Sequence, residues 1–340
     1  MGRFYFKEKS ISMVICCLML AASVNATEPV NIISWWSYIN PEIKSEIEDK
    51  CDVQISVDEY YSNPEFLRRV KRQNHDIAIY SDTVYRTFID AVSTATRDIS
   101  SGLVNQYIEP LQEEYYRSNY LTNTVYYQFS LTGFLWNPNI ITLNKKDSIK
   151  QIFAKAETNT VVVLDEHVEV LNLLSKIEES GLSKNDFVMP SISKVLSLFK
   201  DSDIVVANAL GSLVNKNDFA FAYTWSGEAL WKIQTVAPQL KFLVHPKLSH
   251  WSKDLITLIS SKDSSACVIR ELAGSKHLNK LAVDTYYFSP YANEYYISDA
   301  YNDIYNAFIE SLKNIQPLKR LSPEQYDELD LEWQKIKVNL

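Results

Sequence analysis

The sequence predicts an α/β protein with a parallel sheet and two lobes. Apolar runs of strand type alternate with amphipathic helices over residues 30–80, and this alternation implies right-handed crossovers between parallel strands. The chain has 340 residues, which is too long for one typical core. Four predicted strands also end in clusters of rings, carboxylates or hydroxyls, the position where open α/β sheets usually bind ligands.

The first 26 residues have the pattern of an export signal. Arg3, Lys7 and Lys9 precede a largely apolar stretch over 11–22, which is too short to span a bilayer as a helix. Small residues at 24–26 predict cleavage near Ala26. We therefore expect a soluble, exported, periplasmic protein.

The first predicted strand and helix meet at a corner rich in aromatic residues. An apolar run over 30–33 predicts the strand, and Asn40 followed by Pro41 predicts the start of a helix over 41–50. Trp35, Trp36 and Tyr38 lie between them. One such ring alone is more often packing than a ligand contact, but similar corners recur along the chain.

The later elements repeat this arrangement. Further strands are predicted over 53–57, 77–80, 125–137, 160–164 and 219–224, and helices after the capping-box motif at 62–65, over 262–282 and over 323–337. The segment 125–137 is long enough to cross from one lobe to the other. The polar and aromatic residues that follow or end these elements are Ser81, Glu166, Glu169, Trp225, Trp251, Asp254 and Tyr287.

Composition excludes several functions. The net charge is −8, and removing residues 1–26 leaves 31 basic against 41 acidic residues, or −10, which does not favour nucleic acid. The seven glycines form no phosphate loop, and the five histidines lack metal-ligand spacing. No catalytic motif is present, so we expect no enzyme activity, cofactor or metal.

Two cysteines remain after cleavage, Cys51 and Cys267. In an oxidising compartment they could pair, but the sequence leaves open whether they do.

The strand-end residues suit a flexible aliphatic cation. Ring faces attract ammonium groups by about 0.5 to 2 kcal/mol each and also cover methylenes. Carboxylates hold charged ends through hydrogen bonds of about 1.5 to 3 kcal/mol. The predicted ligand is a polyamine, and the predicted contacts are Trp35, Trp36, Tyr38, Ser81, Glu166, Glu169, Trp225, Trp251, Asp254 and Tyr287.

Six motifs, SWWSYINPEI, YYSNPEF, HDIAIYSD, YYQFSLTGFLWN, YTWSG and YFSP, together resemble the periplasmic polyamine-binding proteins that feed spermidine and putrescine importers. The resemblance implies a monomeric, two-lobed, type II-like periplasmic binding protein with a ligand cleft and hinge strands near 130–137 and 245–256. It implies one lobe of 27–132 plus 253–300 and another of 133–252 plus 301–340. It also implies a membrane permease as partner.

Three positions depart from the family pattern. Asp82 and Thr83 follow Ser81 where the family often has an aromatic residue, and Glu166 stands where it often has an aspartate. One extra residue separates Trp251 from Asp254. These departures affect the expected ligand length more than amine recognition.

Two other functions remain open. The alternative that the resemblance suggests is a polyamine sensor, like relatives of this family that sense norspermidine. Such a sensor would signal to a membrane partner such as a cyclic-di-GMP enzyme. Tyrosine doublets at 60–61, 126–127, 286–287 and 295–296 suggest ferric iron capture less strongly, because the tryptophans have no role in that chemistry.

Overall fold

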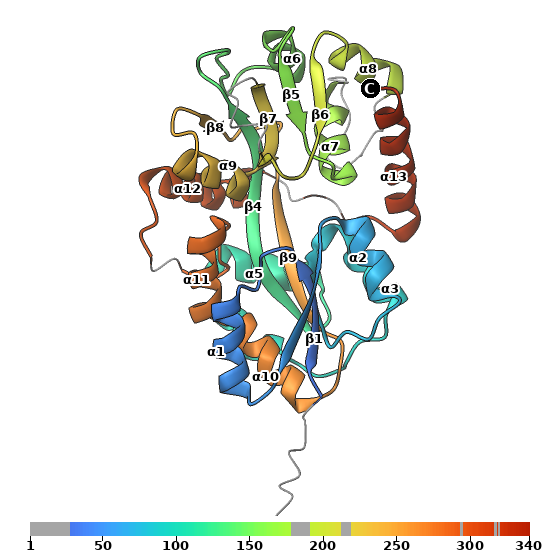
Figure 1. Cartoon of the computed structure of the whole chain (residues 1–340), viewed down its shortest axis with the longest axis vertical. Helices are drawn as coiled ribbons and strands as arrows, with labels where there is room; N and C mark the ends of the chain where they lie inside the picture. The colour runs from blue at the N-terminus through green and yellow to red at the C-terminus, as the bar shows by residue number, and fades with distance from the viewer. Residues whose placement is uncertain (1–27, 178–190, 212–218, 293–294, 316–317, 319) are drawn as a thin grey trace, which may run out of the picture.

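The computed structural model describes residues 28–177, 191–211, 219–292, 295–315, 318 and 320–340, which form two α/β lobes, one above the other in Figure 1. The export signal expected over 1–26 lies outside these residues. In the described part of the chain, no helix combines the length and apolar character needed to cross a membrane.

A mixed sheet runs through both lobes in the order β2-β1-β3-β9-β4-β7-β5-β6, and β8 pairs with β4. Its strands are β1 (Val30–Trp35), β2 (Ile55–Tyr60), β3 (Ile77–Ser81), β4 (Thr124–Trp136), β5 (Thr160–Val163), β6 (Asp203–Val206), β7 (Phe219–Trp225), β8 (Lys241–Leu243) and β9 (Trp251–Leu258). The predicted parallel pairing is confirmed for β1 with β2 and β3, and β5 is parallel to β6 and β7. Strand β6 was not predicted from the sequence.

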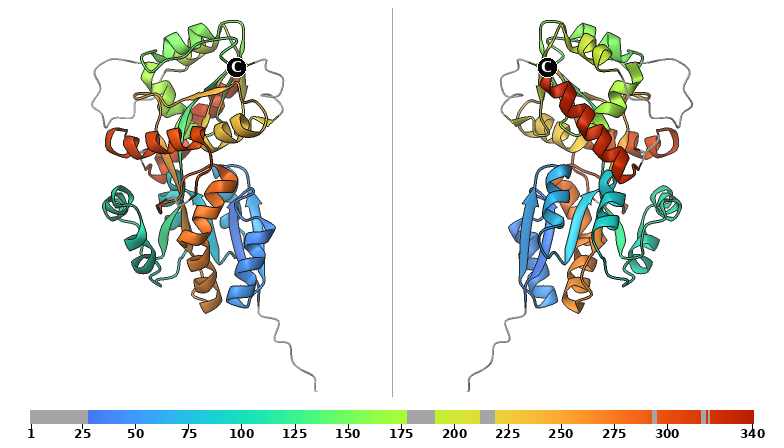
Figure 2. Two further views of the ribbon diagram at one scale, coloured as in Figure 1. Left: turned by 90° about the vertical axis from the view of Figure 1, so that its left-hand side faces the viewer. Right: turned by 90° about the vertical axis from the view of Figure 1, so that its right-hand side faces the viewer.

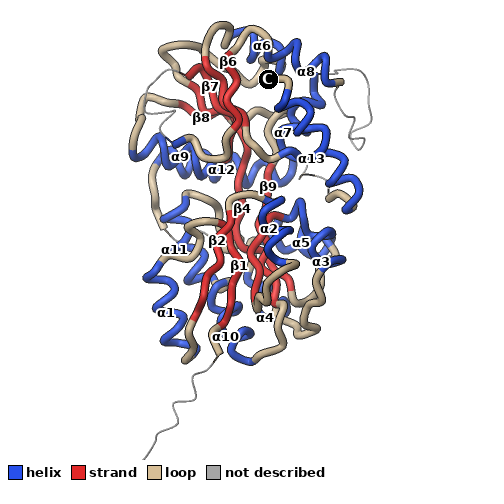
Figure 3. The backbone as a smooth tube through the Cα atoms, turned by 45° about the vertical axis from the view of Figure 1, so that its right-hand side comes forward, coloured by secondary structure: helices blue, strands red, loops and turns tan. Residues whose placement is uncertain are grey.

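Strand β4 joins the lobes. Its first part, through Leu131, pairs antiparallel with β9, and its last part, from Thr132, pairs antiparallel with β7. All 13 residues of β4 are buried, as expected of a strand covered on both faces. Gly133 permits the close approach of β8, because a Cβ there would lie 2.6 Å from the Leu243 carbonyl oxygen. Figure 3 shows β4 and β9 passing between the lobes.

Helices cover the sheet in both lobes (Figure 2). They are α1 (Pro41–Cys51), α2 (Asn63–Val70), α3 (Tyr85–Ala91), α4 (Ser100–Leu103), α5 (Glu109–Ser118), α6 (Ile149–Lys155), α7 (His167–Leu174), α8 (Ile192–Phe199), α9 (Ser226–Thr235), α10 (Asp263–Leu272), α11 (Ser275–Thr285), α12 (Asp299–Asn314) and α13 (Pro323–Val338). Helices α1 and α10 pack together in the lobe that contains β1, whereas α13 packs on α7 and α8 in the other.

The predicted starts of two helices agree with the structure, and one predicted helix is divided in two. Asn40 caps α1 by accepting a hydrogen bond from the Ile43 amide, and Ser62 caps α2 in the same way. The single helical stretch expected over 262–282 is in fact two helices, which separate at Gly274, the N-cap of α11.

A disulfide joins the end of α1 to α10. The Cα atoms of Cys51 and Cys267 lie 5.9 Å apart, and 216 positions separate the two residues in sequence. We expect the oxidised mature protein, unfolded without reductant, to show no free thiol. Serine at both positions should lower the free energy of unfolding by about 2 to 4 kcal/mol in urea titrations, because the unfolded chain loses a long-range constraint. Two titratable thiols would contradict this pairing.

Candidate functional site: carboxylates and rings between the lobes

Side chains from both lobes meet where β4 and β9 pass between them. We call this group the acid–aromatic cluster, and it comprises Trp35, Tyr38, Tyr127, Glu166, Glu169, Trp225, Asp254 and Tyr287. The Tyr38 hydroxyl donates to Asp254 Oδ2 at 2.6 Å. The Tyr38 ring stacks on Tyr127 at 5.7 Å and meets Tyr287 edge-on at 6.2 Å. Trp35 interacts with Asp254, and the contacts of the glutamates and Trp225 follow below. Seven of the ten predicted contacts belong to this group.

The turn after β1 directs Tyr38 inward. Ser37 adopts a left-handed conformation, with φ of 63°, and its amide donates to Glu59 Oε1 at 2.9 Å. This tight turn leaves the Tyr38 side chain buried, and it places Trp36 outside, 57% exposed. Trp36 stacks on Tyr61 at 6.1 Å, so the structure does not bring this predicted contact into the cluster.

The second lobe contributes two glutamates at the start of α7. Glu166 is the N-cap residue and Glu169 lies in the first turn, both almost fully buried. Trp225 ends β7, and its indole Nε1 donates to Glu169 Oε2 at 2.6 Å. A strand end and a helix start thus orient one carboxylate and one ring toward each other.

The carboxylates lie in an electrostatically unfavourable environment. Burial, followed by repulsion from Glu169, raises the pKa of Glu166 to about 8. Burial also raises the pKa of Asp254 to about 7, and Glu169 again contributes. Among the described residues, no lysine or arginine nitrogen lies within 4.0 Å of these three carboxylates. The three carboxylates therefore lie close together without a lysine or arginine partner in the described part of the chain, and this environment favours the protonated forms of Glu166 and Asp254.

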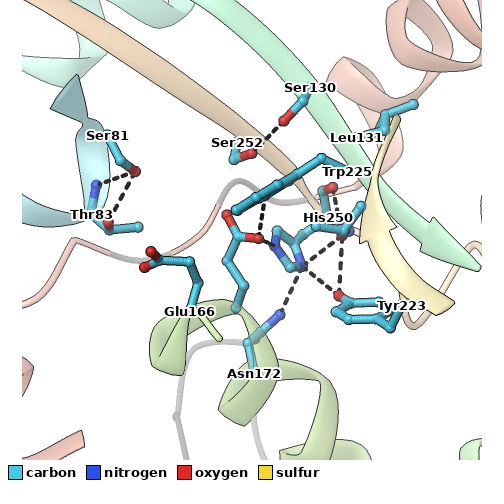
Figure 4. A network of polar contacts seen from close by, with 12 residues as sticks. Ser81, Thr83, Ser130, Leu131, Glu166, Asn172, Tyr223, Trp225, His250 and Ser252 are labelled. Atoms are coloured by element: carbon cyan, nitrogen blue, oxygen red, sulfur yellow. Dashed lines mark hydrogen bonds and ion pairs between the residues drawn. The ribbon is translucent and has the colours of Figure 1, made fainter. Parts of the chain in front are cut away.

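Glu166 also bridges the lobes. Asn63, at the start of α2, donates from Nδ2 to Glu166 Oε2 at 2.8 Å, and Asn208 donates to Oε1 at 3.4 Å. The Asn63 amide also contacts Thr83 Oγ1 at 3.4 Å, and Thr83 bonds Ser81 Oγ at 3.0 Å. The predicted contact Ser81 is therefore connected to the cluster through Thr83 and Asn63. Figure 4 shows the contact between Ser81 and Thr83.

Trp251 and Asp254, which are separated by one residue more than in the family pattern, face opposite sides of β9. Side chains alternate between the faces of a strand, so residues three apart face opposite sides. Trp251 is 2% exposed, and its indole donates to the Ile315 carbonyl oxygen at 3.0 Å. The extra residue between the two positions thus places Trp251 in the core.

The tyrosine doublet of β4 faces two sides in the same way. Tyr126 stacks on Tyr107 at 5.5 Å, whereas Tyr127 stacks on Tyr38. Burial raises the pKa of both phenols well above the usual range, which disfavours the tyrosinates that ferric iron prefers. The residues described here include no group of three or more His, Cys, Asp or Glu side chains suited to a metal ion.

Sequence reasoning missed Tyr127 and Asn63. Tyr127 was visible only as half of a doublet. Asn63 belongs to a capping-box motif in which the Ser62 side chain caps the helix. The side chain of Asn63 is therefore not needed for capping and donates to Glu166 instead.

Comparison with known proteins identifies the fold. No protein-family model matches this sequence, and no curated protein matches it. Among solved structures, a candidate spermidine/putrescine ABC transporter protein from Listeria monocytogenes has a TM-score of 0.75 at 18% identity, over 90% of this chain and 98% of that one. The spermidine/putrescine substrate-binding protein PotD of Streptococcus pneumoniae gives 0.71 at 16% identity, over 91% and 99%. A two-component system protein that mediates signal transduction gives 0.64 at 14% identity, over 89% and 99%. The chain therefore has the two-lobed fold of extracellular solute-binding proteins.

Proposed function

We propose that this chain is a periplasmic binding protein that captures a linear polyamine, such as spermidine or putrescine, for an ABC importer. The observation that supports this most is the convergence of Glu166, Glu169 and Asp254 among aromatic rings, with no lysine or arginine partner in the described ranges of the chain. A ligand with several ammonium groups neutralises such a cluster, and its methylenes pack on the rings.

The energies are sufficient for this role. A charge-assisted hydrogen bond contributes about 1.5 to 3 kcal/mol, and each buried CH2 about 0.8 kcal/mol. Three carboxylates and the methylenes of a triamine then exceed the roughly 8 kcal/mol of a micromolar complex, before the cost of ordering the ligand.

The two lobes supply different parts of this site. In the proposal, lobe 1 comprises 27–132 plus 253–300 and lobe 2 comprises 133–252 plus 301–340, and they close around the ligand as a monomer. Residues 1–26 direct export. The protein binds its ligand without chemical change and needs no cofactor.

Competitive native mass spectrometry tests the ligand class. The mature protein, refolded to remove bound ligand, would be mixed with equimolar putrescine, spermidine, arginine and maltose. We expect one polyamine adduct to dominate. A dominant arginine or maltose adduct would contradict the proposal.

Removing the Trp225 side chain should weaken binding. Trp225→Ala deletes a ring face and the 2.6 Å hydrogen bond that orients Glu169. We expect spermidine affinity to fall at least tenfold in calorimetry, with the circular dichroism spectrum unchanged. Trp231→Ala is the matched control, because Trp231 is 41% exposed on the neighbouring helix α9. Equal affinities for the two variants would show that Trp225 does not contact the ligand.

Polyamine sensing is the second candidate, because the same fold occurs in a two-component system protein. Both roles need the same ligand site and a surface that a membrane partner recognises. Uptake of labelled spermidine by cells with and without the gene separates them. Unchanged uptake, together with tight binding by the purified protein, would favour the sensor.

A further inference from the structure

His250 connects the acid–aromatic cluster to the point where β4 crosses between the lobes. It directly precedes β9 and is 2% exposed. Its amide donates to Thr132 Oγ1 at 3.0 Å, and the Thr132 hydroxyl contacts its carbonyl oxygen at 3.1 Å. Because pairing of β4 changes from β9 to β7 at Thr132, the backbone of His250 is fixed at the crossing itself.

One contact of the imidazole indicates where its proton lies. Nδ1 is 3.4 Å from the Asn172 amide nitrogen and 3.2 Å from the Tyr223 hydroxyl, both labelled in Figure 4, and 3.1 Å from the Thr132 hydroxyl. The two hydroxyls can donate or accept, so the Asn172 contact is the one that distinguishes the tautomers. An amide nitrogen can only donate, so the Asn172 contact is a hydrogen bond only when Nδ1 accepts. In the neutral ring the hydrogen then resides on Nε2.

This Nε2–H group is aimed at a carboxylate of the cluster. Nε2 is buried, has no hydrogen-bond partner among the residues that the structure describes, and lies 3.8 Å from Glu169 Oε2. Glu169 and Asn172 are three residues apart on α7 and so share a face of that helix. One helix therefore contacts both ring nitrogens, and a small shift of Glu169 completes a hydrogen bond.

We propose that His250 is a positioning residue for Glu169. On ligand binding, its Nε2–H donates to the carboxylate, so that Glu169 is held by His250 and Trp225 while it accepts from the ammonium group. Because Thr132 fixes His250, the orientation of Glu169 is coupled to the strand crossing. This inference rests on the proposed polyamine function.

A double-mutant cycle tests the coupling, with spermidine affinity as the readout. His250→Leu should weaken binding about tenfold, and His250→Gln, whose amide can replace the Nε2 donor, should restore it to within about threefold. In a Glu169→Gln background, His250→Leu should change affinity less than threefold. His245→Gln is the matched control, because the ring of this other buried histidine contacts the Lys247 and Leu248 amides instead. If the effects of His250→Leu and Glu169→Gln on the free energy of binding simply add in the double variant, the inference is overturned.

Nitrogen-15 NMR of the wild-type protein measures which ring nitrogen of His250 carries the hydrogen. This experiment requires neither a folded variant nor a ligand. We expect His250 to show an unprotonated Nδ1 and a protonated Nε2, and the opposite tautomer would contradict the proposal. If wild type binds no polyamine, the proposed function fails. If it binds and His250→Leu binds equally well, only the role of His250 fails.

Discussion

Neutralising Glu169 and Asp254 together, by Glu169→Gln and Asp254→Asn, is expected to weaken spermidine binding about a thousandfold. Each carboxylate contributes a charge-assisted hydrogen bond of about 1.5 to 3 kcal/mol, and the two losses combine. The substitutions preserve side-chain shape, and they relieve the repulsion that Glu169 exerts on Asp254. We therefore expect the unliganded variant to be at least as stable as wild type.

The control for this variant removes the same net charge elsewhere. Glu113→Gln and Asp201→Asn neutralise two carboxylates whose side chains are 67% and 56% exposed, in weak surface ion pairs. Spermidine affinity should then change less than threefold, because exposed charges are screened. If both double variants bind alike, general surface charge explains the binding and the cluster does not.

The affinity for a polyamine is expected to rise at least tenfold between pH 6 and pH 8. Burial raises the pKa of Asp254 to about 7 and that of Glu166 to about 8, so both must lose protons before they pair with ammonium groups. Calorimetry at several pH values in buffers of different ionisation enthalpy would measure both the affinity and the protons released.

The free energy of unfolding of the unliganded protein should fall as pH rises, whereas the affinity for a polyamine rises. An acid whose pKa is raised by folding stabilises the folded state below its unfolded pKa, and this contribution is lost as pH rises through the folded pKa. The unliganded protein should thus become less stable from about pH 5 to pH 8, and ligand should reverse the trend. The same affinity measurements would be made on wild type and on Glu166→Gln. If the affinity of neither protein depends on pH, the assignment of these carboxylates to the site is contradicted.

The sequence predicted the elements of the fold because its signals there are local. Asn40 and Ser62 cap helices, and the apolar run of β4 is long enough to be recognised as a crossing strand. The sequence left the Cys51–Cys267 pairing open, since no local pattern shows that α1 and α10 lie side by side.

The site was less predictable because it depends on side-chain direction. Asp254 and Trp251 are close in sequence, but one extra residue places them on opposite faces of β9. Trp36 is adjacent to Trp35, yet the left-handed Ser37 that turns Tyr38 inward leaves Trp36 outside. The sequence did not mark His250 or Tyr127 as members of a ligand site, because their partners are distant in sequence.

The central claim is that the acid–aromatic cluster binds a polyamine, and calorimetric titration of the refolded mature protein tests it most directly. The ligands would be putrescine, norspermidine, spermidine and spermine, with an amino acid as control. We predict micromolar or tighter binding of at least one amine and none of the control, with the preferred length set by the spacing of Glu166, Glu169 and Asp254. The absence of binding to every amine would contradict the account.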